Sequence, residues 1–325
     1  KVKLEEYQAS PLTTSSAFNN AVRPQGFHYN YQVDSKVVAF FTGFSDYSFG
    51  NSSLLFSDLR IESNKYSYDN RMLTGNTKDD GTLCSFGGCY YSRPEDRDDS
   101  FKEVSFRIGV EKNSEIEYLI IQNDKNNFHF NSINISQKQN SISNCFTFSY
   151  SGAVVRNNLN IKLKEKNCYS NMYGFYALRK KSHVDNHTTV DHMDENSISN
   201  EHYKGIMDNN SNGVFNGKIF VRKKAQKTNA FQSNNNILLS DEAKINTKPQ
   251  LEIWADDVKC SHGCTVGQLD KEAMFYLQSR GISKKKAISM LLGAFSEEII
   301  EKIENQFAKQ KIKKLTYKKL EDFTS

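Results

Sequence analysis

The chain has 325 residues and only six scattered cysteines, which allows one elongated domain or two and excludes a small disulfide-stabilised framework. Its net charge of +5 comes from interspersed lysines and acidic residues, so we expect a solvated surface and no binding of nucleic acid. No segment has the roughly 20 consecutive apolar residues of a membrane span, and residues 1–6 lack the apolar core of a secretory signal, so we expect a cytoplasmic protein that does not enter membranes.

Residues 1–110 give the least regular pattern of the chain. Aromatic-rich segments such as Val37–Phe41 predict short strands, which are separated by turns rich in Gly, Asn, Asp and Ser. Cys84 and Cys89 are spaced as in some metal-binding loops, but a single isolated pair is a weak signal, and the glycines between them favour a turn. No functional residue is assigned to this part of the chain.

From residue 104 onward, short strand patterns follow one another without a helical segment between them. This succession excludes a doubly wound α/β sheet and leaves a sandwich, a barrel or a coil of strands. Hairpin dipeptides are few and the polar turns are rich in asparagine, as at Asn234–Asn236, which favours a mainly β protein built as a parallel β-helix of stacked rungs. The strands predicted to stack in succession are Val214–Val221, Asn229–Ser233, Ile237–Leu239, Ala243–Ile245 and Leu251–Trp254.

The period of the apolar residues changes after Gly267, where three helices are predicted. Asp270 and Ser283 have side chains suited to the N-caps of the first two. The predicted organisation is a β-helix core over residues 1–266 and a C-terminal α-helical domain over residues 267–325. Three short helices bury little by themselves, so we expect an apolar stripe of this domain to face a partner. The residues of that stripe are Leu277, Ile288, Leu292 and Phe295.

The residues best suited to chemistry lie where the strands end. Residues two apart on a strand share a face, so Cys260 and His262 are expected to point the same way. A thiolate and an imidazole favour soft or borderline metals, including iron–sulfur species. Even with Cys264 the set falls short of the usual four ligands, so a metal here needs a ligand from elsewhere or from a partner. The alternative is that the pair only packs.

A histidine-rich segment is the second, weaker candidate. On a strand, His183, Asp185 and His187 would share one face, while His192 would lie on the other. Two histidines and a carboxylate are able to hold zinc or iron(II). Histidines on a half-buried sheet more often bond to their neighbours, so His183 and His187 rank below the pair at the end of the strands.

No catalytic signature is present in the sequence. The G-x-S-x-G elbow, the P-loop, the H-E-x-x-H zinc motif and the Rossmann glycine pattern are all absent, so an ATP-driven role requires a separate ATPase. Because β-helices often process polysaccharides, a carbohydrate-active enzyme is one alternative, but the cluster of carboxylates that it needs on one strand stack is not seen. A non-catalytic interaction scaffold is the other alternative.

Several segments of the chain resemble the SufB/SufD family of iron–sulfur cluster assembly proteins, over about residues 145–300. The form of Lys259–Gly263 resembles the SufD branch rather than the SufB branch. The resemblance implies a right-handed parallel β-helix flanked by helices, although the helical N-terminal domain usual in the SufD branch is expected to be absent here. The matching segments are His183–His192, Asn200–Gly205, Gly213–Ile219, Ala225–Thr228, Asn236–Ser240, Thr247–Ile253 and Ala255–Gly263.

The resemblance also implies partners and a role. A SufD-like subunit supports iron acquisition and de novo cluster formation in the bacterial cytoplasm, in a complex with SufB and the ATPase SufC, without a catalytic turnover of its own. Cys260 and His262 match the positions at the β-helix interface with SufB, where a transient cluster or iron is shared and none is held stably by one chain. The helices after Gly267 match the part that docks SufC, and the isolated subunit is expected to form a homodimer.

Overall fold

The structure is a computed structural model that describes most of the chain after residue 100 and shorter segments before it. The described residues are 36–42, 55–62, 65–69, 84–93, 101–123 and 128–324, with side chains described from residue 107 onward. The first strands are β1 (Lys36–Thr42), β2 (Leu55–Glu62), β3 (Lys65–Asp69), β4 (Cys84–Arg93), β5 (Phe101–Val110), β6 (Glu115–Asn123), β7 (Phe128–Gln137) and β8 (Ile142–Ser151). They are followed by β9 (Val154–Leu163), β10 (Tyr169–Leu178), β11 (His183–His192), β12 (Ile198–Met207), β13 (Asn212–Val221), β14 (Thr228–Leu238), β15 (Lys244–Ile253) and β16 (Val258–Gly267). Three helices and a short 3₁₀ turn close the chain, at α1 (Lys271–Ser279), α2 (Lys284–Ile300), α3 (Gln306–Glu321) and η1 (Asp322–Thr324).

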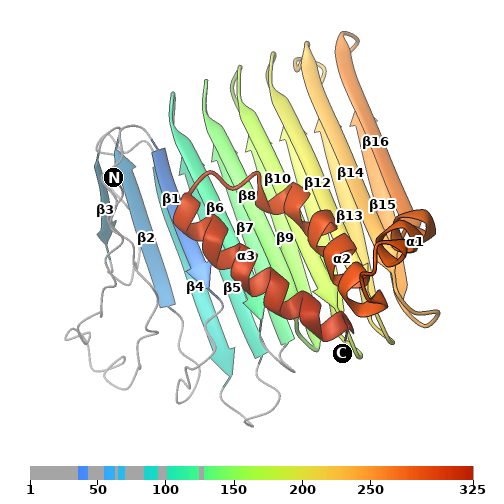
Figure 1. Cartoon of the computed structure of the whole chain (residues 1–325). Coiled ribbons are helices and arrows are strands. Elements are labelled where there is room, and N and C mark those ends of the chain that lie inside the picture. Colours follow the sequence, from blue (N-terminus) through green and yellow to red (C-terminus); the bar gives the residue numbers. More distant parts are fainter. Residues whose placement is uncertain are drawn as a thin grey trace, which may run out of the picture.

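From β5 onward the strands alternate between two sheets. The even-numbered strands β6 to β16 stack side by side in one sheet with β1 at its edge, and the odd-numbered strands β5 to β15 stack in the other. All of these pairings are parallel, so the chain coils as a parallel β-helix (Figure 1). The predicted mainly β fold, a parallel β-helix followed by C-terminal helices, is confirmed.

The first strands of the second sheet depart from this pattern. β4 pairs antiparallel with both β2 and β5, and β3 pairs antiparallel with β2. Val37–Phe41 lies in β1 as predicted, whereas Cys84–Cys89 lies in strand β4 and not in the predicted turn. The glycines of that segment are therefore accommodated within a sheet. The predictions for residues 1–35 fall outside the described residues.

Two of the strands are longer than the sequence pattern predicted. Asn229–Ser233 and Ile237–Leu239 fall in the single strand β14, except for Leu239 directly after its end. Ala243–Ile245 and Leu251–Trp254 fall in the single strand β15, except for Ala243 directly before it and Trp254 directly after it. The stacked neighbours are also alternate strands, because β13 pairs with β15 while β14 pairs with β12 and β16. Polar residues in the middle of each strand interrupt the apolar pattern without interrupting the backbone pairing.

Asparagine has two structural roles in the β-helix. At the turns, Asn113, Asn140 and Asn167 have φ angles of 58°, 59° and 60°, a left-handed conformation that asparagine tolerates better than most residues. Their amides form a ladder, with Nδ2 of Asn140 donating to Oδ1 of Asn113 at 2.9 Å and Nδ2 of Asn167 to Oδ1 of Asn140 at 3.0 Å. Asn234 and Asn236, by contrast, lie inside strand β14 and not in the predicted turn, and Nδ2 of Asn236 donates to Oδ1 of Asn234 at 2.7 Å.

Two tyrosine rings fill the interior by lying over glycines of a neighbouring strand. A Cβ atom on Gly174 of β10 would lie 2.1 Å from Cδ1 of Tyr203 on β12, and one on Gly205 of β12 would lie 2.2 Å from Cε2 of Tyr176 on β10. Tyr203 also packs against Phe215 of the opposite sheet, with ring centroids 5.1 Å apart. Both tyrosines are buried, so a large side chain on one rung occupies the space that a glycine leaves on the next.

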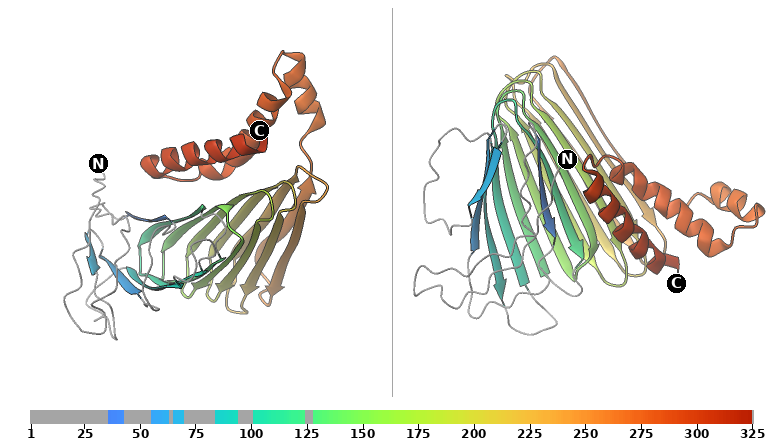
Figure 2. Two further views of the ribbon diagram at one scale, coloured as in Figure 1. Left: turned by 90° about the horizontal axis from the view of Figure 1, so that it is seen from below. Right: turned by 60° about the vertical axis from the view of Figure 1, so that its left-hand side comes forward.

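Helices α2 and α3 cover the outer face of the seven-stranded sheet (Figure 2). Leu292, Ile299 and Ile312 are fully buried there, in one hydrophobic cluster with Phe146 and Phe175 of the strands. Burial of a side chain of this size stabilises the packed state by roughly 1.5–3 kcal/mol. The helices and the sheet therefore share a core.

Polar contacts fix the position of α3. The Glu117 carboxylate of β6 is fully buried and accepts the backbone N–H groups of Glu304 at 3.0 Å and Asn305 at 3.4 Å, just before the helix begins. A carboxylate at this place pairs with N–H groups that have no partner within the helix. Farther along, the hydroxyl groups of Tyr150 and Thr316 lie 2.5 Å apart.

Helix α1 differs from the other two because it projects beyond the sheets (Figure 2). It packs on α2, and none of its residues is buried. Asp270 caps its N-terminus by accepting the N–H groups of Glu272 and Ala273, as its sequence position predicted. Among the helices in the described ranges, none combines the length and the apolar character needed to cross a membrane.

Candidate functional site

The β-helix ends in two strands that each lack a neighbour on one side. β16 pairs with β14 and is the last strand of its sheet, and β15 pairs with β13 and is the last strand of the other. Both lie at the same end of the β-helix, drawn in orange in Figure 1. This open end exposes two rows of unpaired backbone N–H and C=O groups, which another strand is able to pair with.

Cys260, His262 and Cys264 continue the interior of the β-helix onto this last strand. In the parallel register, Ala230 pairs with Cys260, Gln232 with His262 and Asn234 with Cys264. Ala230, Gln232 and Asn234 are buried inside the β-helix. The three candidate ligands therefore point toward the same side as the interior residues, at the position where a further rung would cover them.

The three candidates differ in exposure. Cys260 is half-buried and packs against the interior cluster, while His262 and Cys264 are exposed. Burial raises the pKa of the Cys260 thiol, an effect that a hydrogen bond with the backbone of Ala230 partly opposes. The thiol is therefore protonated at neutral pH in the unliganded chain, and binding a metal would release its proton.

The open end does not form a complete metal site. Residues two apart on a strand are separated by roughly 6.6 Å, which is too far for three consecutive same-face side chains to surround one ion without rearrangement. In the part of the chain that the structure describes, no three His, Cys, Asp or Glu side chains converge to hold a metal ion. A metal at Cys260 and His262 needs further ligands from outside the chain.

The weaker candidates, His183 and His187, lie on the outer face of β11. They share that face with Asp185, and His192 points into the interior, as predicted. Asp185 forms an ion pair with Arg156, and its Oδ1 lies 3.0 Å from Nε2 of His187. Burial lowers the pKa of His187 more than the Asp185 carboxylate raises it.

The structure thus does not form the zinc or iron(II) site considered for His183, Asp185 and His187. No convergent metal-binding group is found there among the described side chains. The Asp185 carboxylate, which a metal would need as a ligand, is instead paired with the Arg156 guanidinium. The structure supports local pairing with neighbouring side chains for Asp185 and His187.

The expected apolar docking stripe is not a free surface. Leu292 is completely buried, and Ile288 and Phe295 pack at the edge of the cluster between helices and sheet. Nζ of Lys204 lies 4.0 Å from the centre of the Phe295 ring, which covers that ring further. Leu292 is therefore not available to a partner, because the outer face of the β-helix supplies the burial that the three helices do not supply to one another, whereas a docking role for the half-buried residues of the stripe stays a prediction. Leu277 of α1 is half-buried.

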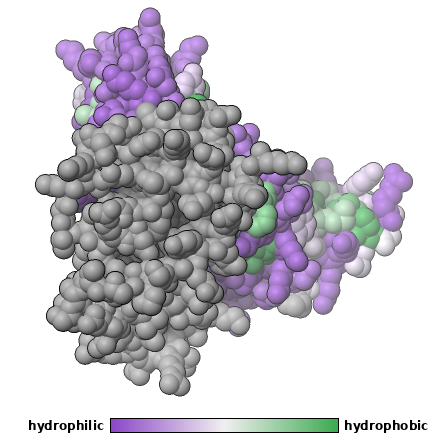
Figure 3. Space-filling model, turned by 90° about the vertical axis from the view of Figure 1, so that its left-hand side faces the viewer, coloured by the Kyte–Doolittle hydropathy of each residue, from purple (hydrophilic) through white to green (hydrophobic). Residues whose placement is uncertain are grey.

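The exposed apolar residues of the helices are ones that the sequence analysis did not select. Phe275 and Tyr276 of α1 are 75% and 57% exposed, and Met290 of α2 is 42% exposed. Apolar surface is visible on the part of the helices that projects from the body of the protein (Figure 3). These residues lie outside the apolar stripe that the helical period predicts. An apolar residue outside that stripe is the sequence signal that could have identified them as exposed.

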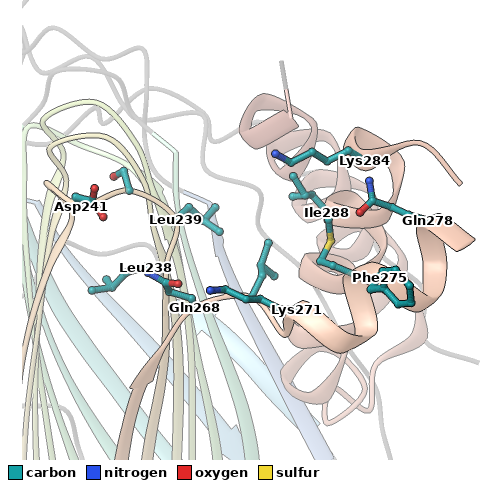
Figure 4. A pocket seen from close by; sticks show the side chains of 12 residues that line it. Leu238, Leu239, Asp241, Gln268, Lys271, Phe275, Gln278, Lys284 and Ile288 are labelled. Carbon is teal, nitrogen blue, oxygen red and sulfur yellow. The ribbon is translucent and has the colours of Figure 1, made fainter.

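A cleft of about 450 Å³ separates α1 and the start of α2 from the end of β14 (Figure 4). Apolar side chains, including Leu239, Phe275 and Ile288, line it together with charged ones such as Asp241 and Lys271. The cleft leaves Phe275 accessible on the cleft side of α1. The exposed aromatic surface of α1 is therefore not packed onto the strands.

The comparisons with known proteins point to one family. The sequence profile of the domain described as "SUF system FeS cluster assembly, SufBD core domain" matches residues 84–295. The chain is 34% identical over 215 residues to the iron-sulfur cluster assembly protein SufD of Escherichia coli, which covers 65% of this chain and 50% of that protein.

Two further relatives match a similar part of the chain. The SufBD family protein slr0076 of Synechocystis is 34% identical over 204 residues, covering 62% of this chain and 45% of the relative. The chloroplastic protein ABCI7 of Arabidopsis thaliana is 30% identical over 201 residues, covering 61% of this chain and 42% of the relative. The chain spans about half the length of the curated relatives that it matches.

Proposed function

The chain belongs to the SufBD family of the SUF iron–sulfur cluster assembly system, and from this premise we propose that it acts as a SufD-like scaffold subunit. In this role it supports iron acquisition and de novo cluster formation at a shared interface, without catalysing a reaction. Hydrolysis of ATP belongs to a separate subunit, SufC. The iron or nascent cluster is the cargo of the assembly, held transiently and in part by a partner chain.

One observation carries this proposal most directly. Cys260 and His262 extend the interior columns of the β-helix onto its last strand β16, which has no neighbour on its outer side. A thiol and an imidazole suit iron and iron–sulfur species. Their position at an open edge, with fewer than three ligands converging, supports a site that a second β-helix completes.

The partner proposed for the open end is SufB. Pairing along β15 and β16 would bury the unpaired edge groups of both strands and bring the partner's ligands beside Cys260 and His262. In the absence of SufB the same edge would pair with a second copy of this chain, giving a homodimer. Cys264 lies on the same face and is a candidate for a third ligand, and a second thiol, of this chain in the shared site.

The ligand role is tested by co-expression with SufB and SufC, anaerobic purification and measurement of iron–sulfur absorbance per complex. Cys260→Ser and His262→Ala are each expected to reduce the cluster content at least fivefold, because each removes one ligand from an incomplete set. His183→Ala, on the outer face of β11, is the matched control and should leave cluster content unchanged. Full cluster content in both variants would discard the ligand role and favour an interaction scaffold that does not bind the cluster.

SufC is proposed to bind the projecting helix α1. Exposed Phe275 and Tyr276 have the aromatic character of residues that dominate protein interfaces. Phe275→Glu is expected to weaken SufC binding at least tenfold in a titration by calorimetry, because it places a charge in the centre of the contact. Lys314→Glu, a charge change on an exposed residue of α3, is the control. Equal affinities of the two variants would remove α1 from the interface.

A further inference from the structure

A buried pair of polar residues lies directly beneath the candidate ligand His262. In the parallel register, Glu201 of β12 pairs with Gln232 of β14, and Gln232 pairs with His262 of β16. Adjacent strands of a sheet lie roughly 4.8 Å apart. The three side chains therefore form one column, which begins in the interior and ends at the open end.

The orientation of the Gln232 amide is fixed on one side. Its Nε2 atom donates a hydrogen bond to Oε2 of Glu201, and both residues are only 3% exposed. A Cβ atom on Gly217 of the opposite sheet would lie 2.1 Å from this Nε2 atom, so the missing side chain of Gly217 provides the space that the amide occupies. At a pH above 7, where Glu201 is ionised, its carboxylate accepts hydrogen bonds and does not donate them, so the amide nitrogen has to face Glu201 and the amide oxygen cannot.

The other end of the amide lacks a partner. Oε1 of Gln232 is buried and accepts no hydrogen bond from the described residues. A buried acceptor without a donor is costly, and water does not reach this atom. The His262 ring, on the next position of the column, is exposed and makes no hydrogen bond within the described part of the chain, so rotation about its side-chain bonds is unrestrained.

We propose that Gln232 is a positioning residue for His262, with Glu201 fixing the direction of the Gln232 amide. One ring N–H of His262 donates to Oε1 of Gln232. A neutral imidazole has one N–H group and one bare nitrogen, so this bond selects a single tautomer and leaves the other nitrogen free, facing the open end. Histidines that bind metals commonly have the second ring nitrogen fixed by such an acceptor.

This inference rests on the proposed ligand role of His262 but is tested without a cluster. The ratio of the two neutral tautomers of His262 is measured by nitrogen-15 NMR on the purified, metal-free chain labelled at histidine, and the His262→Ala variant identifies the resonances. In the unaltered chain one tautomer should dominate. Gln232→Met, which keeps the volume but removes the acceptor, should change the ratio at least fivefold, toward the ratio of a free histidine.

Two further variants separate positioning from general loosening of the fold. Glu201→Gln allows either end of the Gln232 amide to face residue 201, so it should shift the ratio in the same direction by a smaller factor. Asn236→Ser removes a buried amide from the column that ends at Val266, so it should leave the His262 ratio unchanged. The same ratio in Gln232→Met and in the unaltered chain would overturn the proposal, whatever the cluster content of the His262→Ala complex.

Discussion

Replacement of Gly174 by alanine is expected to destabilise the protein by about 3 kcal/mol or more. The new Cβ atom would lie 2.1 Å from two atoms of the Tyr203 ring, a separation that real structures do not contain. The ring has little room to retreat, because it is buried and packs against Phe215 of the opposite sheet. Overfilling a close-packed interior typically costs 1–3 kcal/mol and more where neither neighbour is able to move.

The measurement is the midpoint of urea unfolding, followed by circular dichroism and by the fluorescence of Trp254, the one tryptophan in the sequence. Gly263→Ala is the matched control, because a Cβ atom on this residue of β16 meets no other atom within 4 Å. The control should unfold within about 0.5 kcal/mol of the unaltered protein, as surface substitutions do. Similar midpoints for the two variants would contradict the close approach of Tyr203 to Gly174.

Replacement of Glu201 by glutamine is expected to stabilise the protein at alkaline pH and to leave it unchanged near pH 4.5. Burial raises the pKa of the Glu201 carboxyl from 4.5 to about 7, an effect that the hydrogen bond from Gln232 partly opposes. In the folded state the group keeps its proton up to a higher pH than in the unfolded chain. Its contribution to stability is therefore fully present below pH 4.5 and is lost as the pH rises through 7.

The shift corresponds to about 3 kcal/mol, at about 1.4 kcal/mol for each pKa unit. Glutamine has no proton to lose, so the advantage of Glu201→Gln should grow between pH 4.5 and 7 and remain near about 3 kcal/mol at pH 8. Burial also lowers the pKa of His192 to about 4, which makes stability fall as the pH decreases from 6.5 toward 4, but this contribution is common to both proteins and cancels in the difference.

Urea unfolding of the two proteins at pH 5 and pH 8 measures this difference. Glu242→Gln, an exposed carboxylate after β14, is the control and should show no dependence on pH relative to the unaltered chain. A constant difference for Glu201→Gln at both pH values would mean that ionisation of Glu201 does not limit stability. If Glu201→Gln both stabilises the protein and changes the tautomer ratio of His262, the destabilising buried carboxylate would be linked to the positioning of His262.

The general architecture was accessible from the sequence because many short strand patterns followed one another without helices or hairpin signals. The extents of β14 and β15 were not, since residues such as Asn235 and Lys248 stand in the middle of strands where apolar alternation was expected. Strands β10 and β12 were also missed, because polar residues interrupt their apolar alternation too. Their interior faces carry Gly174 and Glu201, whose roles depend on residues of neighbouring rungs and opposite sheets.

The candidate ligands were predicted correctly as residues of one face, because the two-residue period of a strand is a local property. Their position at an open end, above a column of buried polar residues, required the register between strands that lie about thirty residues apart in sequence. The docking stripe was assigned to a partner because the sequence did not show that apolar residues of the strands, such as Phe146 and Phe175, line the outer face of the sheet. The helices pack against that face.

The stacking of rungs also determines how finely a second chain must be aligned. Each strand from β9 to β13 and at β15 and β16 has ten residues, and each residue of β16 has one partner in β14. A strand added to β16 would face Cys260 and His262 in only one register, and a slip by a single residue would turn its own ligands to the outer side. If a second chain adds a strand to β16, the register of that pairing would therefore fix which of its residues lie opposite Cys260 and His262, whether or not a metal is bound.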